Sequence, residues 1–199
     1  MLVFQVGAQK SKQADLDLPN VRPVNAKKDN EALLLIKEAN NLTSRNYDPE
    51  TWRFAEEQLQ KAMKTAPWRE AEVKKGLYNL YISEGNYFLR GVESGLGDLE
   101  LAEKAHRKAM ENTDLLGRTF VCITLAVKFK QSMEFWFKQD HNKSALPAER
   151  AERAYEKAKD YVRQVGHEYD QTELYDEVWR AHDKALKASG LTYAKDVRR

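Results

Sequence analysis

The sequence predicts an all-α protein, and three observations lead to this prediction. Charged residues make up 32% of the 199-residue chain, above the roughly 25% of an average domain. Glycine and proline are scarce, at 9 and 5 residues. From Asp29 onward, apolar residues recur at helical spacing. We therefore expect about seven antiparallel helices, stacked as α-hairpins in a solenoid or a bundle, in a single domain over residues 29–199. The scarcity of turn residues excludes a β-sandwich and disfavours a nucleotide-binding α/β fold.

Residues 1–28 are expected to form an extended arm, because Pro19 and Pro23 would interrupt a helix and no helical period is present. Five basic residues stand against two acidic ones, which gives the arm a net charge of +3. The candidate partner-binding residues are three apolar residues near the start and these five basic ones: Leu2, Val3, Phe4, Lys10, Lys12, Arg22, Lys27 and Lys28. We expect the arm to dock in an acidic groove on another chain, with the three apolar residues as its anchor.

The first three helices are delimited by prolines and capping residues. The first is expected to run from Asp29 to the Asn46–Pro49 turn, where Asp48 is a candidate N-cap and Pro49 the first residue of the second helix. The second helix should end near residue 66, before Pro67. A third helix over about 69–91 then leads into a glycine-rich loop at 91–97.

Four more helices follow the glycine-rich loop. Asp98 is the expected cap of a helix over about 99–113, and Gly117 separates this helix from the next, over about 118–139. A sixth helix is expected at 147–165, from Pro147 to the residue before Gly166. The last helix, at about 171–189, should end at Gly190.

The helix predicted at 118–139 is apolar around most of its circumference, so we expect neighbouring helices to bury it. Aromatic residues gather in this helix and in the one predicted at 69–91. They are Tyr78, Tyr81, Tyr87, Phe88, Phe120, Phe129, Phe135, Trp136 and Phe137. We interpret them as core side chains; the open alternative is a groove that takes a partner's side chains.

A common pattern recurs in the second, fourth and sixth predicted helices. In each, two alanines lie seven residues apart with a larger residue between them. The three sets are Ala55, Leu59 and Ala62; Ala102, His106 and Ala109; and Ala151, Tyr155 and Ala158. Small residues seven apart on one face let two helices approach closely. The spacing of 47 and then 49 residues suggests three stacked helical hairpins.

The run Ala55-x3-Leu59-x2-Ala62-x4-Pro67 resembles the second helix of a tetratricopeptide repeat. This resemblance covers only the second helices and indicates the wider tetratricopeptide-like superfamily. It implies a scaffold that binds protein partners on a concave surface. A second resemblance covers residues 33–80, where Tyr47-x4-Trp52 followed by Leu59-x2-Ala62 is similar to a FIVAR module. Such modules are three-helix spacers of bacterial surface proteins.

Few residues suggest chemistry. The single cysteine, Cys122, cannot form an internal disulfide and is expected to be a buried, inert side chain. Glu103-x2-His106 has the spacing of half a di-iron site but lacks the second copy, so we interpret it as part of a solvated helix face. The acidic start of the last helix, Asp170 to Glu177, suits the helix dipole. We predict no catalytic residue, no metal and no cofactor.

We expect a non-catalytic structural or adaptor subunit that binds other proteins within a larger assembly, with copies of itself among the candidate partners. A nearly neutral body gives no basic footprint for nucleic acid, and no apolar run is long enough to span a membrane. The first residues are similar to the end of a secretory signal but lack its basic start, so the compartment stays undetermined. Two alternatives remain open, an exported spacer or solute-binding module and a helical-bundle enzyme.

Overall fold

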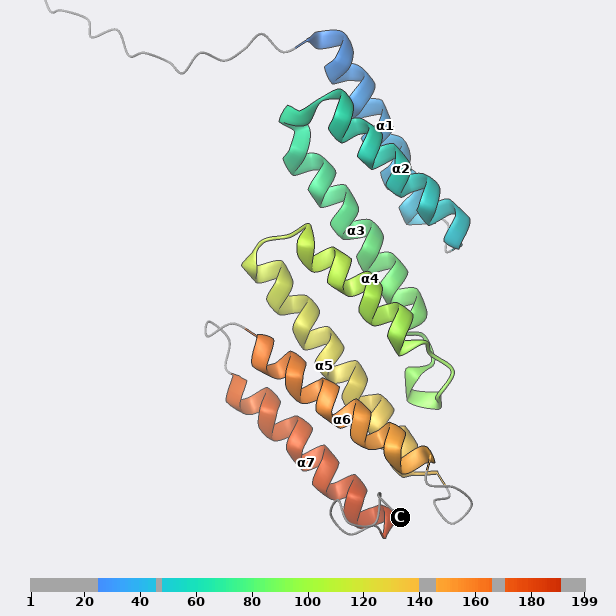
Figure 1. Ribbon diagram of the computed structural model, residues 1–199, viewed down its shortest axis with the longest axis vertical. Coiled ribbons are helices and arrows are strands. Elements are labelled where there is room, and N and C mark those ends of the chain that lie inside the picture. The colour runs from blue at the N-terminus through green and yellow to red at the C-terminus, as the bar shows by residue number, and fades with distance from the viewer. Residues whose placement is uncertain (1–24, 46–47, 140–145, 166–170, 191–199) are drawn as a thin grey trace, which may run out of the picture.

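The computed structural model describes residues 25–45, 48–139, 146–165 and 171–190. This part of the chain is all-α, as predicted, and contains no strand (Figure 1). The helices are α1 (Ala26–Arg45), α2 (Pro49–Thr65), α3 (Glu70–Phe88), α4 (Leu99–Glu111), α5 (Leu115–Phe137), α6 (Leu146–Gln164) and α7 (Gln171–Ser189), with 3-10 turns η1 (Pro67–Arg69) and η2 (Val92–Ser94). The chain reverses direction from each helix to the next, so the N-terminal ends of α1, α3, α5 and α7 follow one another along one side of the molecule (Figure 1).

Aspartate caps fix the starts of α2, α4 and α5, and the first two of these caps were predicted from the sequence. The Asp48 carboxylate accepts hydrogen bonds from the backbone N–H groups of Glu50 and Thr51, both at 3.1 Å, and Pro49 opens α2 as predicted. Asp98 accepts from Leu101 N at 3.0 Å and caps α4, again as predicted.

Two helix starts lie earlier than the sequence suggested. Helix α1 begins at Ala26 because Asn25 accepts from Lys28 N at 3.2 Å. The last three residues assigned to the arm are therefore helical, and the exposed Lys27 and Lys28 lie in the first turn of α1. Helix α5 begins at Leu115 because Asp114 accepts from Gly117 N at 2.9 Å. Sequence reasoning treated that glycine as a separator.

Helix α3 ends at Phe88, three residues before the expected position. Gly91 and Gly95 both have left-handed backbone conformations, with φ of 78° and 74°, which L side chains rarely adopt. Between them lies η2, so part of the predicted loop is ordered as a 3-10 turn. The Asp98 N–H donates to the Phe88 carbonyl at 2.9 Å and closes the loop.

The helices pack as successive pairs, α1 with α2, α3 with α4 and α5 with α6. Between pairs, α1 also packs against α3, and α5 against α7. Helices α3 and α5 make no comparable contact; their pairs meet through α4 and through η2, which packs on α5 (Figure 1). The series of odd-numbered helices is therefore interrupted in the middle of the molecule.

The buried side chains form two main clusters on either side of this interruption. One cluster combines α1, α2 and α3 and includes Trp52, Leu59 and Leu80. The other combines α5, α6 and α7 and includes Phe129 and Tyr161, whose rings stack with centroids 5.9 Å apart. Half-buried side chains from α3, Tyr78 and Ile82, pack against both clusters and join them.

Neighbouring helices bury nine of the 23 residues of α5, but the core interpretation of its aromatic residues is wrong for Phe120, which is exposed. Phe129 and Phe137 are buried, as is Tyr81 of α3. The remaining members of the aromatic set are half-buried: Tyr78, Tyr87, Phe88, Phe135 and Trp136. The exposed Phe120 lies in the first turns of α5, where Leu115 and Leu116 are exposed too.

The alanine pattern of α2, α4 and α6 faces the interior. All six alanines are fully buried, and the residues between them, Leu59, His106 and Tyr155, are buried too. Helical contact of this kind needs side chains no larger than a methyl group where backbones approach closely. Among the described residues, no helix is long and apolar enough to cross a membrane.

Candidate functional site

An open groove with mainly apolar walls lies at the N-terminal end of α5. It has a volume of about 470 Å³. Its lining comes from α3, the α4–α5 turn and the first turns of α5: Tyr78, Thr113, Asp114, Leu116, Gly117, Thr119, Phe120 and Ile123. Most of these contribute apolar surface, in a protein whose surface is otherwise strongly charged. We call this hollow the α3/α5 groove.

Two large apolar side chains of the groove are exposed, Leu116 at 69% and Phe120 at 62%. Leu115, next to the groove lining in sequence, is 58% exposed, although single exposed leucines are common on protein surfaces. Leu116 and Phe120 are four residues apart and lie on one face of α5, and half-buried Ile123 continues that face inward. A contiguous apolar patch of this kind is typical of a binding surface.

Local backbone chemistry positions this patch. The Asp114 cap sets the direction in which α5 starts, and Gly117 lies so close to Thr113 that an added Cβ would sit 2.0 Å from the threonine Oγ1. A side chain at position 117 would force the turn open. The glycine therefore keeps the α4–α5 turn tight and holds Leu116 and Phe120 next to it.

The other end of α5 lies against a different turn. Here η2 packs on the helix, and the backbone of Gly95 comes so close to Phe135 that an added Cβ would lie 2.4 Å from its ring. At the N-terminal end of α5, the α4–α5 turn lines the groove instead, through Thr113 and Asp114.

The electrostatics of the groove favour binding of a neutral, apolar ligand over acid–base catalysis. Burial raises the pKa of Tyr78, and the nearby Asp114 charge raises it further, so the phenol stays protonated. The Asp114 carboxylate is engaged as the cap of α5. The groove thus offers hydroxyl groups and apolar surface, without a paired acid and base.

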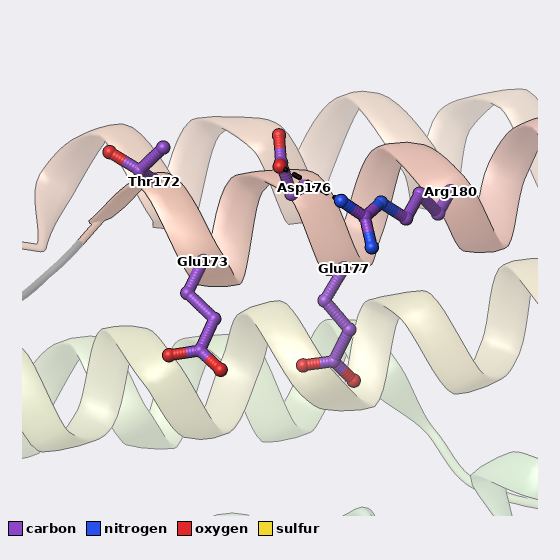
Figure 2. A pocket seen from close by; sticks show the side chains of 5 residues that line it. All are labelled: Thr172, Glu173, Asp176, Glu177 and Arg180. Atoms are coloured by element: carbon purple, nitrogen blue, oxygen red, sulfur yellow. Dashed lines mark hydrogen bonds and ion pairs between the residues drawn. The ribbon is translucent and has the colours of Figure 1, made fainter.

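A second hollow, of about 720 Å³, lies on α7 and is broad and shallow. It is lined by Thr172, Glu173, Asp176, Glu177 and Arg180, and Figure 2 shows the two glutamates directed toward α5. Cations already neutralise part of its charge, because Arg180 pairs with Asp176 at 3.3 Å and Lys130 of α5 pairs with Glu177. These ion pairs, together with the dipole of α7, give its acidic residues a structural role.

The Glu103–His106 pair is not a solvated face, contrary to the sequence interpretation. His106 is 1% exposed, and its ring lies against Gly85, where an added Cβ would be 2.2 Å from Nδ1. Glu103 accepts hydrogen bonds from Lys157 at 2.8 Å and from the Tyr161 hydroxyl at 2.7 Å. No group of metal-ligating side chains exists among the described residues.

His182 is a buried polar residue that sequence reasoning did not identify. Its Nε2 lies 3.0 Å from Glu152 Oε1, and its ring stacks on Tyr155 with centroids 3.8 Å apart. It occupies the apolar face of α7 together with Val178 and Leu186. Only its place in that helical period could have indicated burial.

The predicted arm contacts cannot be compared with this geometry. Leu2, Val3, Phe4, Lys10, Lys12 and Arg22 lie outside the described residues, as do Asn46, Asp170 and the loop at 140–145. The groove itself was missed because α5 was predicted to start at residue 118, which left Leu115 and Leu116 in a connecting turn. Their position directly before a helix with an apolar face is the signal that could have revealed it.

No protein-family model matches the chain, and no curated protein or solved structure is significantly similar to it.

Proposed function

We propose that this protein is a non-catalytic adaptor, a helical-repeat subunit that binds other proteins within a larger assembly. The observation that carries the proposal is the α3/α5 groove, where Leu116 and Phe120 expose apolar surface between two helical pairs. Burial of such side chains is the main favourable term in protein association. The basic residues of the N-terminal arm, from Lys10 to Lys28, remain a predicted contact for an acidic partner.

The repeat part of the proposal is supported by a polar contact that recurs between alternate helices. Glu56 of α2 lies 3.5 Å from Lys108 of α4, and Glu103 of α4 lies 2.8 Å from Lys157 of α6. Each glutamate directly follows the first alanine of its pattern, and each lysine directly precedes the second.

Tyrosine hydroxyls complete both contacts. Tyr81 donates to Glu56 at 2.8 Å, as Tyr161 does to Glu103 at 2.7 Å. The glutamate and lysine positions are equivalent in the two contacts, as expected between neighbouring units of a helical repeat, whereas the tyrosines differ in position, on α3 and on α6. The likeness of the second helices to tetratricopeptide repeats favours the same architecture, a scaffold with a partner-binding surface.

The groove fits an apolar segment of a partner better than a charged one. Its walls present Leu116, Phe120 and Ile123 on α5 and the Tyr78 ring on α3, with threonine hydroxyls at the edge. Grooves between helices bind the apolar face of an amphipathic helix or an extended segment with two or three apolar anchors. Such anchors would contribute most of the binding energy.

The test is a binding comparison between two phenylalanine variants. Phe120→Asp places a charge in the groove, whereas Phe54→Asp makes the same change on the exposed face of α2. We expect that proteins which bind the wild type and the Phe54→Asp variant do not bind the Phe120→Asp variant. Binding of each purified candidate is then measured by titration calorimetry, where the groove variant should weaken affinity by at least about tenfold. Equal affinities for the two variants would refute the groove as the binding surface.

A further inference from the structure

We propose that α7 provides a second protein-binding surface, on the side of the helix that faces away from α5. Its occupant is a helix of a partner protein that has two small residues seven positions apart and a lysine directly before the second, and this lysine pairs with Glu152. The surface is separate from the α3/α5 groove. The inference rests on the helical-repeat part of the proposed function, because it extends the contacts that join successive pairs.

Helix α7 lies at one end of the stack (Figure 1). Each earlier odd-numbered helix packs with the helix that follows it, α1 with α2, α3 with α4 and α5 with α6. Helix α7 packs on α5 and α6, and among the described residues no further helix follows it. In this part of the chain, the position that an even-numbered helix would take beside α7 is therefore open.

Two aromatic side chains mark the open side of α7. Tyr175 and Trp179 are 39% and 46% exposed, and they share an i, i+4, i+7 stripe with the buried His182. Glu177, which pairs with Lys130 of α5, lies about 200° around the helix from Trp179, since each residue turns the helix by about 100°. The two aromatic rings therefore lie on the side away from α5, next to the part of α7 that contacts α6 through His182.

Glu152 of α6 makes one half of a polar contact that is complete at Glu56 of α2. Glu56 accepts hydrogen bonds from Tyr81, on the odd-numbered helix that follows it, and from Lys108, on the next even-numbered helix. Glu152 occupies the same position in the alanine pattern of its own helix. On the odd-numbered helix that follows, His182 Nε2 lies 3.0 Å from Glu152 Oε1 and thus corresponds to Tyr81.

The lysine half of the contact is open at Glu152. The side chain is 30% exposed, and no lysine or arginine in the described part of the chain forms an ion pair with it. A lysine on a helix beside α7 would restore the arrangement that Lys108 makes with Glu56 and that Lys157 makes with Glu103. Charge complementarity at this point selects a partner helix with a basic residue there.

A folded second copy of this chain does not offer such a helix. The alanine faces of α2, α4 and α6 are already used inside the molecule, where all six alanines are fully buried. The occupant is therefore a helix of a different protein. Its small residues let its backbone lie close to the rings of Tyr175 and Trp179, as interiors packed to high density require.

The test uses a peptide with the sequence of residues 98–112, the α4 helix with its cap, because it carries both alanines and Lys108. A hydrocarbon staple between positions 100 and 104, which are exposed in the protein, keeps the short peptide helical. Fluorescence anisotropy of the labelled peptide measures its binding to the full-length protein. Trp179→Ser should weaken binding at least about fivefold. The matched control is Trp68→Ser, at a tryptophan of similar exposure (48%) beside α3, which should bind as the wild type does.

A second comparison tests the ion pair. Glu152→Gln removes the charge but keeps the side-chain volume and a hydrogen-bonding oxygen next to His182. It should weaken binding of the stapled peptide by about threefold. A peptide with Lys108→Met should bind the wild type and Glu152→Gln equally well, because it lacks the group that senses the charge.

Absence of peptide binding would overturn the inference, as would equal effects of Trp179→Ser and Trp68→Ser, or a Lys108→Met peptide that still distinguishes Glu152→Gln from the wild type. Two other occupants are tested as well. Wild-type dimers that Trp179→Ser dissociates would assign the surface to a second copy, and peptide binding that requires deletion of residues 191–199 would assign it to the same chain; either result overturns the inference. Failure of the proposed function is separate, since Phe120→Asp alters the groove and should leave peptide binding unchanged.

Discussion

His106 is a residue whose surroundings make it sensitive to pH. Its Nδ1 lies 2.9 Å from the Ala102 carbonyl oxygen and donates to it, while Nε2 is buried without a hydrogen-bond partner among the described residues. Burial lowers the pKa of this imidazole, and the bond to Ala102 only partly opposes that effect. The neutral ring therefore fills the position that Leu59 occupies in the equivalent pattern of α2.

We predict that His106→Leu flattens the pH dependence of stability on the acidic side. The unfolded state binds a proton near the ordinary histidine pKa of about 6.5, whereas the folded state does not until a lower pH. Stability of the wild type therefore falls as the pH drops below about 6.5 toward the lowered folded-state pKa. The free energy of unfolding of both proteins, from urea titrations between pH 5 and pH 7.5, checks this. Parallel pH profiles would show that the histidine does not titrate in this way.

Phe129 and Phe135 should differ in their contribution to stability although both lie on α5. Phe129 is buried and stacks on Tyr161, so Phe129→Ala should cost roughly 3–5 kcal/mol. Phe135 is half-buried against Gly95, so its truncation should cost distinctly less. Chemical denaturation of the two variants measures the difference. Equal losses, or no loss for Phe129→Ala, would contradict the position of α5 in the core.

For single residues, the sequence predicts burial correctly only where burial depends on the face of the helix that the residue occupies. The buried alanines and Phe129 follow from the helical period. Phe120 and His106 do not, because their exposure depends on where the next helix begins and ends. His106, a polar residue on a charged helix, is buried, and Phe120, an aromatic residue on an apolar helix, is exposed. Each environment is the opposite of the one that composition suggests.

At the scale of elements, the alanine pattern limits how closely α2 and α4 pack with their neighbours. Ala62→Leu and Ala109→Leu should each destabilise the protein by roughly 1–3 kcal/mol, because both positions are fully buried and a larger side chain overpacks them. The control is Gln60→Leu, on the exposed face of α2, which should change stability by less than about 0.5 kcal/mol. Thermal denaturation of the three variants beside the wild type measures these differences in stability. Tolerance of both alanine changes would mean that the pattern is an accident of composition.

Helix boundaries are predicted best where a side chain fixes them. Asp48 with Pro49, and Asp98, give the starts of α2 and α4 correctly, because capping is a local interaction. The start of α5 was placed too late, since the tight contact of Gly117 with Thr113 is visible only in three dimensions. For the same reason the sequence could not show that η2 packs on α5, and thus that α3 and α5 are held apart.

At the scale of the whole molecule, the arm should contribute little to the stability of the fold. Deleting residues 1–24 leaves α1 complete from Ala26, and the first core residue is Ala32. We expect the free energy of unfolding to change by about 1 kcal/mol or less, because the described buried cluster of α1 begins at Ala32, after the deleted residues. Loss of cooperative unfolding would instead place the arm in the core.

The all-α class and the order of the hairpins were predictable, since periodicity and breakers encode them directly. The groove was not, because it depends on how α3 and α5 are placed relative to each other, whereas helical periodicity shows only which face of each helix is buried. Its location depends on how two separately packed clusters are set against each other, a property that no local pattern records.

The division into two clusters has a mechanical consequence. A force applied between α1 and α7 passes through the contacts that join the clusters: α4 and η2 on α5, and the side chains of Tyr78 and Ile82. Since the groove lies at this junction, we expect stretching or bending of the molecule to change the groove before it disturbs either cluster. We expect a bound segment to act there as a brace between the two halves.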